Sequence, residues 1–121
     1  MDMAELTAKK CVACRRDAPR LSPQQAREYL TATPGWSISE QSDRLSRTFT
    51  FEDFRTAMAF VNRVADVAEE EGHHPDFAIH WNRVDILLWT HKINGLHEND
   101  FIMAAKASGL AQAGTNPRPK P

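Results

Sequence analysis

The chain has 121 residues, which is enough for one compact domain and too few for two that fold independently. Its 15 Lys and Arg against 16 Asp and Glu leave a formal net charge of -1, which argues against binding to nucleic acid or a membrane surface, because both need a basic excess. A hydrophobic content of 41% and a charged content of 26% are typical of a globular protein rather than a disordered one.

The N-terminal region is polar and basic, and it holds both cysteines of the chain. An early acid with no apolar run after it predicts no signal peptide, and no stretch approaches the ~20 apolar residues of a membrane span. Cys11 and Cys14 fit a redox dithiol, half of a zinc site or two ordinary residues. We favour ordinary residues, because a zinc site needs a second pair and a redox motif normally opens a helix after a strand. Two thiols without an export signal fit a cytoplasmic protein.

The first predicted elements are a helix and two strands. Ser22-Pro23-Gln24-Gln25 is typical of a helix start, with Ser as N-cap and Pro at the first helical position. We expect this helix to end near Leu30, before Pro34-Gly35, and a short strand to follow over 36–38. Residues 44–51 alternate between the two faces of a strand, which predicts a half-buried strand.

The longest periodic segment is 52–71, and it predicts an amphipathic helix. Thr50 is the expected N-cap, and Gly72 is the expected residue just past the helix end. We interpret the apolar stripe as core packing rather than as a cofactor site. The residues that recur at helical spacing are Phe54, Ala57, Met58, Val61, Val64, Ala65 and Ala68.

Two strands of an antiparallel hairpin follow, over 77–81 and 84–91. The alternation within the second strand places His91 among apolar neighbours near the strand end. A last helix is expected over 98–107, with Gly109 as its stop signal.

The order helix, strand, strand, helix, strand, strand, helix lacks βαβ regularity. It predicts an α+β domain, a four-stranded antiparallel sheet with three helices packed on one face. We expect three regions: an N-terminal arm with the CxxC pair over 1–20, the folded domain over 21–108, and a flexible C-terminal tail over 109–121.

Three consecutive carboxylates, Glu69-Glu70-Glu71, end the long helix, where the helix dipole is negative. Residues that oppose a local structural preference, as these carboxylates oppose the helix dipole, are expected at functional sites. We interpret Glu70 and Glu71 as a solvated acidic face. Glu69 lies four residues before His73, so we expect it to point toward that imidazole.

The 5 histidines all fall within residues 73–97. His73 and His74 lie in a loop after a helix, where catalytic groups often collect. We expect the sheet to bring His91 beside this loop and Asp100 to join the cluster. Three imidazoles are also the ligand set of a catalytic zinc site, although no helical His pair supports zinc here.

These residues resemble those of the pterin-4a-carbinolamine dehydratases, also called 4a-hydroxytetrahydrobiopterin dehydratases. The resemblance covers roughly residues 22–107, and the spacing of its histidine motif is highly specific. It implies an α+β fold with a four-stranded antiparallel sheet, and assembly as a homodimer or homotetramer. The chain departs from the pattern at His97, where many members have Ser or Thr as a helix N-cap. The matching residues are Glu69-x-x-x-His73-His74-Pro75, Trp81, Thr90-His91, Gly95-Leu96 and Asp100.

The resemblance implies a hydro-lyase in tetrahydrobiopterin recycling for aromatic amino-acid hydroxylases. The substrate is a 4a-hydroxytetrahydropterin, a small-molecule partner, and the products are the quinonoid dihydropterin and water. The implied catalytic residues are His73, His74 and His91, with Glu69 and Asp100 as supporting acids. No metal or redox cofactor is expected, because the oxidation state does not change.

Loss of water needs a proton delivered to the leaving hydroxyl and another removed from a ring nitrogen, and imidazoles suit both tasks. We expect His73 and His91 to move the protons, in roles the sequence does not assign, and His74 to hold the substrate. One carboxylate would fix an imidazole tautomer. Trp36 and Trp89 are candidates for a flat wall against the pterin.

Four further aromatic and histidine side chains receive structural interpretations. Phe77 and Trp81 share a strand face with Ile79, so we assign them to core packing. His80 and His97 are assigned to surface or capping roles.

Two other functions stay open. Members of this family act as dimerisation partners of a transcription factor, so an interaction module that pairs through the helix over 52–71 is one alternative. A zinc site at the histidine cluster is the other. Which pterin is used also stays open.

Overall fold

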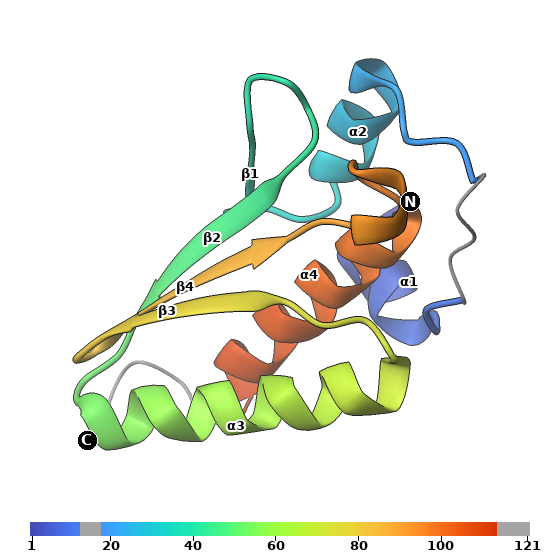
Figure 1. Ribbon diagram of the computed structural model, residues 1–121. Helices are drawn as coiled ribbons and strands as arrows, with labels where there is room; N and C mark the ends of the chain where they lie inside the picture. Colours follow the sequence, from blue (N-terminus) through green and yellow to red (C-terminus); the bar gives the residue numbers. More distant parts are fainter. Residues whose placement is uncertain (13–17, 114–121) are drawn as a thin grey trace.

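The computed structural model describes residues 1–12 and 18–113 (Figure 1). Within them, no helix combines the length and hydropathy that crossing a membrane requires. The elements in chain order are α1 (Met3–Ala8), α2 (Pro23–Leu30), β1 (Ser37–Ile38), β2 (Leu45–Thr50), α3 (Phe54–Glu71), β3 (Asp76–His80), β4 (Arg83–Leu88), a 3-10 helix η1 (His91–Ile93) and α4 (Glu98–Ala113).

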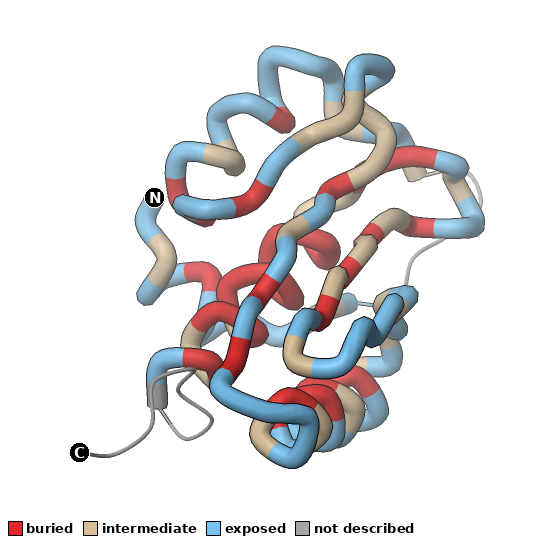
Figure 2. Tube along the Cα trace, turned by 90° about the vertical axis from the view of Figure 1, so that its left-hand side faces the viewer, coloured by how far each residue is buried: buried red, intermediate tan, exposed pale blue. Residues whose placement is uncertain are grey.

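The four strands form one antiparallel sheet in the order β1-β2-β4-β3, which confirms the predicted α+β fold. β2 and β4 pair along their whole length, from Leu45 opposite Leu88 to Thr50 opposite Arg83. Helices α3 and α4 cover one face, while the face that carries Ser46, Thr48 and Thr50 is open (Figures 1 and 2). The strand residues buried beneath the helices include Leu45, Phe49, Val84, Ile86 and Leu88.

Helix α3 forms as predicted but begins at a different cap. The Asp53 side chain accepts a 2.8 Å hydrogen bond from the Thr56 N–H, so Asp53 is the N-cap and the prediction of Thr50 is wrong. Thr50 belongs to β2 instead, because the β2–β4 pairing extends to it. The helix ends as predicted at Gly72, whose φ of 67° lies in the left-handed region that glycine adopts without strain. The buried residues of α3 are Ala57, Phe60, Val61, Val64 and Ala68.

Helix α4 is longer than predicted. It continues to Ala113 rather than ending near Ala107, so Gly109 does not stop it and the first residues of the expected tail are helical. Glycine inside a helix costs roughly 1 kcal/mol relative to alanine. The continued helix buries Leu110 partly and Ala111 almost fully, which offsets that cost. Residues 114–121 of the expected tail lie outside the described residues.

The hairpin of β3 and β4 is also shorter than predicted. Trp81 lies in the turn with a φ of 51° and is 65% exposed, so its assignment to core packing is wrong. Phe77 is half-buried against the core, as expected. β4 ends at Leu88, and His91 opens η1 rather than closing the strand.

The N-terminal region contains a helix that the sequence analysis did not predict. α1 has only 6 residues and is capped by the Asp2 side chain, which accepts a hydrogen bond from the Glu5 N–H. Leu6 is fully buried, and α1 packs on α4. A helix this short is marginal alone, so tertiary contacts must stabilise it.

Candidate active site

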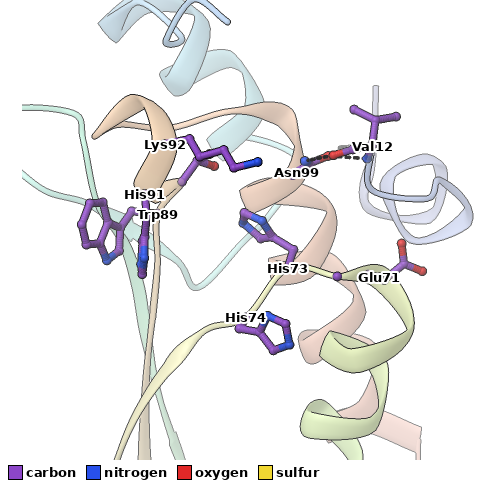
Figure 3. Close-up of a pocket in the computed structure, with 10 residues that line it drawn as sticks. Val12, Glu71, His73, His74, Trp89, His91, Lys92 and Asn99 are labelled. Carbon is purple, nitrogen blue, oxygen red and sulfur yellow. Dashed lines mark hydrogen bonds between the residues drawn. The ribbon is translucent and has the colours of Figure 1, made fainter. Parts of the chain in front are cut away.

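A pocket of about 530 Å³ opens where the end of α3, the loop after it and the segment after β4 meet the start of α4 (Figure 3). Its volume lies within the range of small-molecule sites. Four residues predicted to act on or hold the substrate, His73, His74, Trp89 and His91, line it together. The remaining lining residues are Val12, Glu71, Gly72, Thr90, Lys92 and Asn99.

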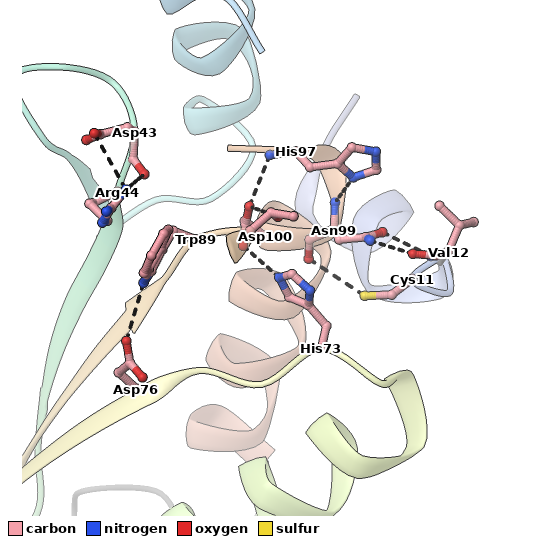
Figure 4. A network of polar contacts seen from close by, with 11 residues as sticks. Cys11, Val12, Asp43, Arg44, His73, Asp76, Trp89, His97, Asn99 and Asp100 are labelled. Atoms are coloured by element: carbon pink, nitrogen blue, oxygen red, sulfur yellow. Dashed lines mark hydrogen bonds and ion pairs between the residues drawn. The ribbon is translucent and has the colours of Figure 1, made fainter. Parts of the chain in front are cut away.

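The end of α3 holds His73 in place. The N–H groups of Gly72 and His73 both donate to the Ala68 carbonyl, at 2.9 and 3.2 Å. These two hydrogen bonds to one carbonyl end the helix and set the direction in which the loop leaves it. The His73 side chain is only 11% exposed and lies beside Asp100 of α4 (Figure 4).

Asp100 is fully buried and is the organising acid of the pocket. Its Oδ1 lies 2.7 Å from His73 Nε2. Its Oδ2 accepts from the Thr90 hydroxyl at 2.7 Å and from the His97 N–H at 3.0 Å. An ionised carboxylate only accepts hydrogen bonds, so this arrangement favours the His73 tautomer with its proton on Nε2 and leaves Nδ1 for a ligand.

Glu69 pairs with a different histidine from the one expected. Its Oε2 lies 2.7 Å from His74 Nε2, and both side chains are well exposed, so the expected contact of Glu69 with His73 is wrong. The reason is the left-handed turn at Gly72, after which His73 lies against Asp100 of α4 and His74 lies against Glu69. A pair this exposed contributes little to stability.

An aromatic stack forms the wall opposite His73. The rings of Trp89 and His91 lie 4.0 Å apart between centroids, and the Arg44 guanidinium covers Trp89 at 3.6 Å from its centroid. Trp89 Nε1 also donates to Asp76 at 3.4 Å. The His91 imidazole is exposed at the pocket, and within residues 1–12 and 18–113 no hydrogen bond engages it.

The other candidate residues lie elsewhere. Trp36 is buried in the core, where its Nε1 donates to the Ser108 hydroxyl at 2.9 Å, and it does not line the pocket. His80 is exposed on the hairpin, 3.8 Å from Asp85. His97 precedes α4, and its Nδ1 accepts from the Asn99 N–H at 3.0 Å, so this imidazole serves as a helix cap as expected.

Sequence reasoning missed several pocket residues. Val12 comes from the N-terminal region, and no sequence signal connects it with a loop some 60 residues away. Asn99 precedes Asp100 directly, but an amide in a helix start carries no specific signal. Glu71, expected to be solvated, has a side chain that is only 5% exposed and lies 3.8 Å from Lys106, so that expectation is wrong.

Cys11 lies at the back of this region. Burial, followed by the negative charge of Glu71, raises the pKa of its thiol to about 12. A thiol held protonated is a poor nucleophile and a poor metal ligand, which favours the structural interpretation of Cys11. Cys14 lies outside the described residues. Among the residues that the structure describes, no cluster of three or more His, Cys, Asp or Glu is arranged to hold a metal ion.

Solved structures share this architecture. The transcriptional coactivator/pterin dehydratase from Brucella melitensis matches with a TM-score of 0.74 and 39% identity over 77% of this chain and 99% of its own. A pterin dehydratase-like protein identified as a RuBisCO assembly factor in the alpha-carboxysome matches with a TM-score of 0.58 and 26% identity, over 66% and 93% of the two chains.

Sequence comparisons agree with the structural ones. Proteins from Aromatoleum aromaticum and Methylococcus capsulatus, both provisionally named pterin-4-alpha-carbinolamine dehydratase, are each 47% identical to this chain. The matches cover 88% and 92% of this chain and 96% and 97% of theirs. The family model described as pterin 4 alpha carbinolamine dehydratase matches residues 19–110. The chain therefore belongs to the pterin 4 alpha carbinolamine dehydratase family.

Proposed function

We propose that the protein dehydrates a 4a-hydroxytetrahydropterin to the quinonoid dihydropterin and water, in the recycling of tetrahydrobiopterin. The observation that carries this proposal is one pocket lined by three imidazoles, with a buried carboxylate behind one of them. The carbon–oxygen bond at C4a breaks, one proton joins the departing hydroxyl, and one proton leaves a ring nitrogen. Oxidation states do not change, so proton transfer is the chemistry the site must supply.

His73 and His91 are the proposed proton carriers. The Asp100 contact orients His73 and leaves one of its ring nitrogens for the substrate. His91 is exposed to the pocket and stacked on Trp89, so it can exchange protons with solvent between turnovers. Which of the two acts as acid depends on which side of the pterin faces each ring.

The remaining lining groups have proposed binding roles. His74, held by Glu69, is placed to donate to or accept from the polar edge of the pterin. Trp89 lies between the Arg44 guanidinium, 3.6 Å from its ring centroid, and the His91 ring, 4.0 Å from it, so both of its faces are covered and its proposed role is to support His91 at the pocket. Trp36 is buried away from the pocket lining, so we assign substrate stacking to neither tryptophan.

The test is a coupled assay in which a hydroxylase generates the carbinolamine. We expect His73→Ala and His91→Ala each to lower kcat by about 10²–10⁴-fold, the usual contribution of one positioned proton-transfer group. His80→Ala is the matched control, because His80 is an exposed imidazole on the hairpin, away from the pocket. Wild-type rates in both pocket variants would reject the proposal.

A protein-interaction function is the second candidate. One solved relative is described as a transcriptional coactivator/pterin dehydratase, and another is identified as a RuBisCO assembly factor. The chain also exposes Phe54, Ile79 and Trp81, which are large apolar side chains that a partner or a second copy in a homodimer or homotetramer would cover. Wild-type protein without dehydratase activity that still captures a specific partner would favour this function.

A further inference from the structure

The N-terminal segment 3–12 lies outside the matched family region, which begins at residue 19, yet it is built into the fold. Leu6 is fully buried in the common core. Lys106 of α4 donates to the Thr7 carbonyl at 2.7 Å. The segment therefore runs along α4 toward the start of that helix and contacts it at several points.

The end of this segment makes its most specific contacts beside the pocket (Figure 4). The Asn99 side chain pairs with the backbone of Val12 in both directions: its Oδ1 accepts the Val12 N–H at 3.0 Å, and its Nδ2 donates to the Val12 carbonyl at 2.7 Å. The Cys11 N–H donates to Glu71 Oε1 at 2.7 Å. These contacts join the segment to the last residue of α3 and the first turn of α4.

Asn99 connects the segment to the proposed chemistry. It is only 2% exposed, and it lies in the first turn of α4 directly before Asp100, the acid that contacts His73. At this helix start the Asn99 N–H is capped by His97 Nδ1, and the Asp100 N–H donates to the His97 carbonyl, both at 3.0 Å. The Asn99 side chain takes no part in this cap, so its two hydrogen bonds to Val12 add a separate restraint, from outside the helix, on the turn that carries Asp100.

We infer that residues 3–12 form a clasp whose pairing with Asn99 positions the Asp100–His73 pair, which makes Asn99 a positioning residue. This inference rests on the proposed dehydration and deepens it. Both the oxygen and the nitrogen of the Asn99 amide are hydrogen-bonded to the Val12 backbone, so this side chain acts through Asp100 rather than on the pterin. Displacement of a catalytic group by ~1 Å lowers the reaction rate by up to about 10²-fold, so loosening this turn should lower the rate measurably.

The test uses two variants that break the same pair from opposite sides, in the full chain. Asn99→Ala removes the amide, and Val12→Pro removes the N–H at a residue whose side chain is 62% exposed. We expect each to lower kcat about ten- to a hundredfold with a smaller change in KM. Asn62→Ala, an exposed amide on α3, is the matched control and should keep the wild-type kcat.

A second readout separates positioning from general stability and does not need turnover. The ¹⁵N shifts of the His73 ring report its tautomer. We expect the proton to reside on Nε2 in the wild type and to be shared between both nitrogens in the two variants. Unchanged His73 shifts, or unchanged kcat in folded variants, would overturn the clasp.

The two proposals fail in different ways. Absence of carbinolamine turnover by the wild-type protein would reject the dehydratase function. The His73 spectra of the variants would still support or overturn the clasp in that case, because they depend only on the Asp100 contact.

Discussion

At the scale of single residues, the partner of each imidazole decides what it can do. His73 is nearly buried against an acid that holds one of its nitrogens, whereas His91 is exposed and only stacked. His74 pairs with Glu69 in solvent. His97 is occupied by capping α4. Chemically identical side chains thus differ in their surroundings: His73 is oriented by a buried carboxylate, His91 is exposed beside an aromatic ring, His74 pairs with an exposed carboxylate, and His97 caps a helix.

Cys11 gives a prediction at the same scale. In a Cys14→Ser background, we expect folded protein to react with iodoacetamide at pH 8 about 100-fold more slowly than the same protein unfolded in urea. The physical reason is the thiol pKa of about 12, which burial raises and which leaves little thiolate. Mass spectrometry of the alkylated fraction over time measures it.

The raised pKa of the Cys11 thiol also predicts how the free energy of unfolding depends on pH. The folded pKa lies above the unfolded value, so the contribution of the buried thiol is present below about pH 8.5 and is lost as the pH rises toward 12. A Cys11→Ala variant should lack this loss of unfolding free energy at alkaline pH, as measured by urea unfolding at a series of pH values.

In the alkylation experiment, equal rates for Cys11 in folded and unfolded protein would contradict the raised pKa of its thiol.

At the scale of elements, helix ends decide how the site is built. Gly72 ends α3 so that His73 turns toward α4. The start of α4 uses an unusual reciprocal cap, in which His97 Nδ1 accepts from the Asn99 N–H and Asp100 accepts from the His97 N–H. The helix that carries the buried acid is therefore capped partly by that acid itself.

His97 tests this cap. We expect His97→Ala to lower the free energy of unfolding by about 1 kcal/mol, the usual cost of losing an N-cap side chain. His97→Ser should lose less, because a hydroxyl can accept the same backbone N–H. Urea unfolding measures both. If serine destabilised the protein as much as alanine, the imidazole would have a role other than capping.

At the scale of the whole molecule, the sheet leaves β3 as an unpaired edge, and all its residues except Phe77 are exposed. Ile79 and Trp81 on or beside this strand are exposed apolar side chains, and Phe54 at the start of α3 is another. Exposed edge strands readily pair with another chain. This arrangement fits the proposed homo-oligomer and indicates where to probe it.

Trp81→Asn is the probe. Asparagine tolerates the positive φ of this turn better than tryptophan, so the change removes apolar surface without adding backbone strain. We expect the dissociation constant of the oligomer to rise at least about tenfold, as for a buried aromatic anchor. Light scattering coupled to gel filtration measures it. An unchanged mass at low concentration would place the interface elsewhere.

Much of the fold follows from local sequence. The Ser22 capping box, the alternation of 44–51 and the helical spacing before Gly72 each predict an element that the structure contains. These signals succeed because the hydrogen bonds and the apolar faces involved lie within a few residues of each other. Thr50 shows where a local signal fails: its residue type suits an N-cap, but the pairing of β2 with β4 extends to it, and Asp53 caps the helix instead.

The sequence by itself determined the histidine motif, the acids near it and the α+β order of elements. Only the tertiary structure decided that Asp100 contacts His73 and Glu69 contacts His74, that Trp36 lies in the core, and that Val12 reaches the pocket. The physical reason is that the contacts of Asp100, Trp36 and Val12 join segments far apart in the chain, while the choice of His74 over His73 by Glu69 follows from His73 being held against Asp100. Their geometry depends on how α3, α4 and the sheet pack, and no local pattern of residues specifies that packing.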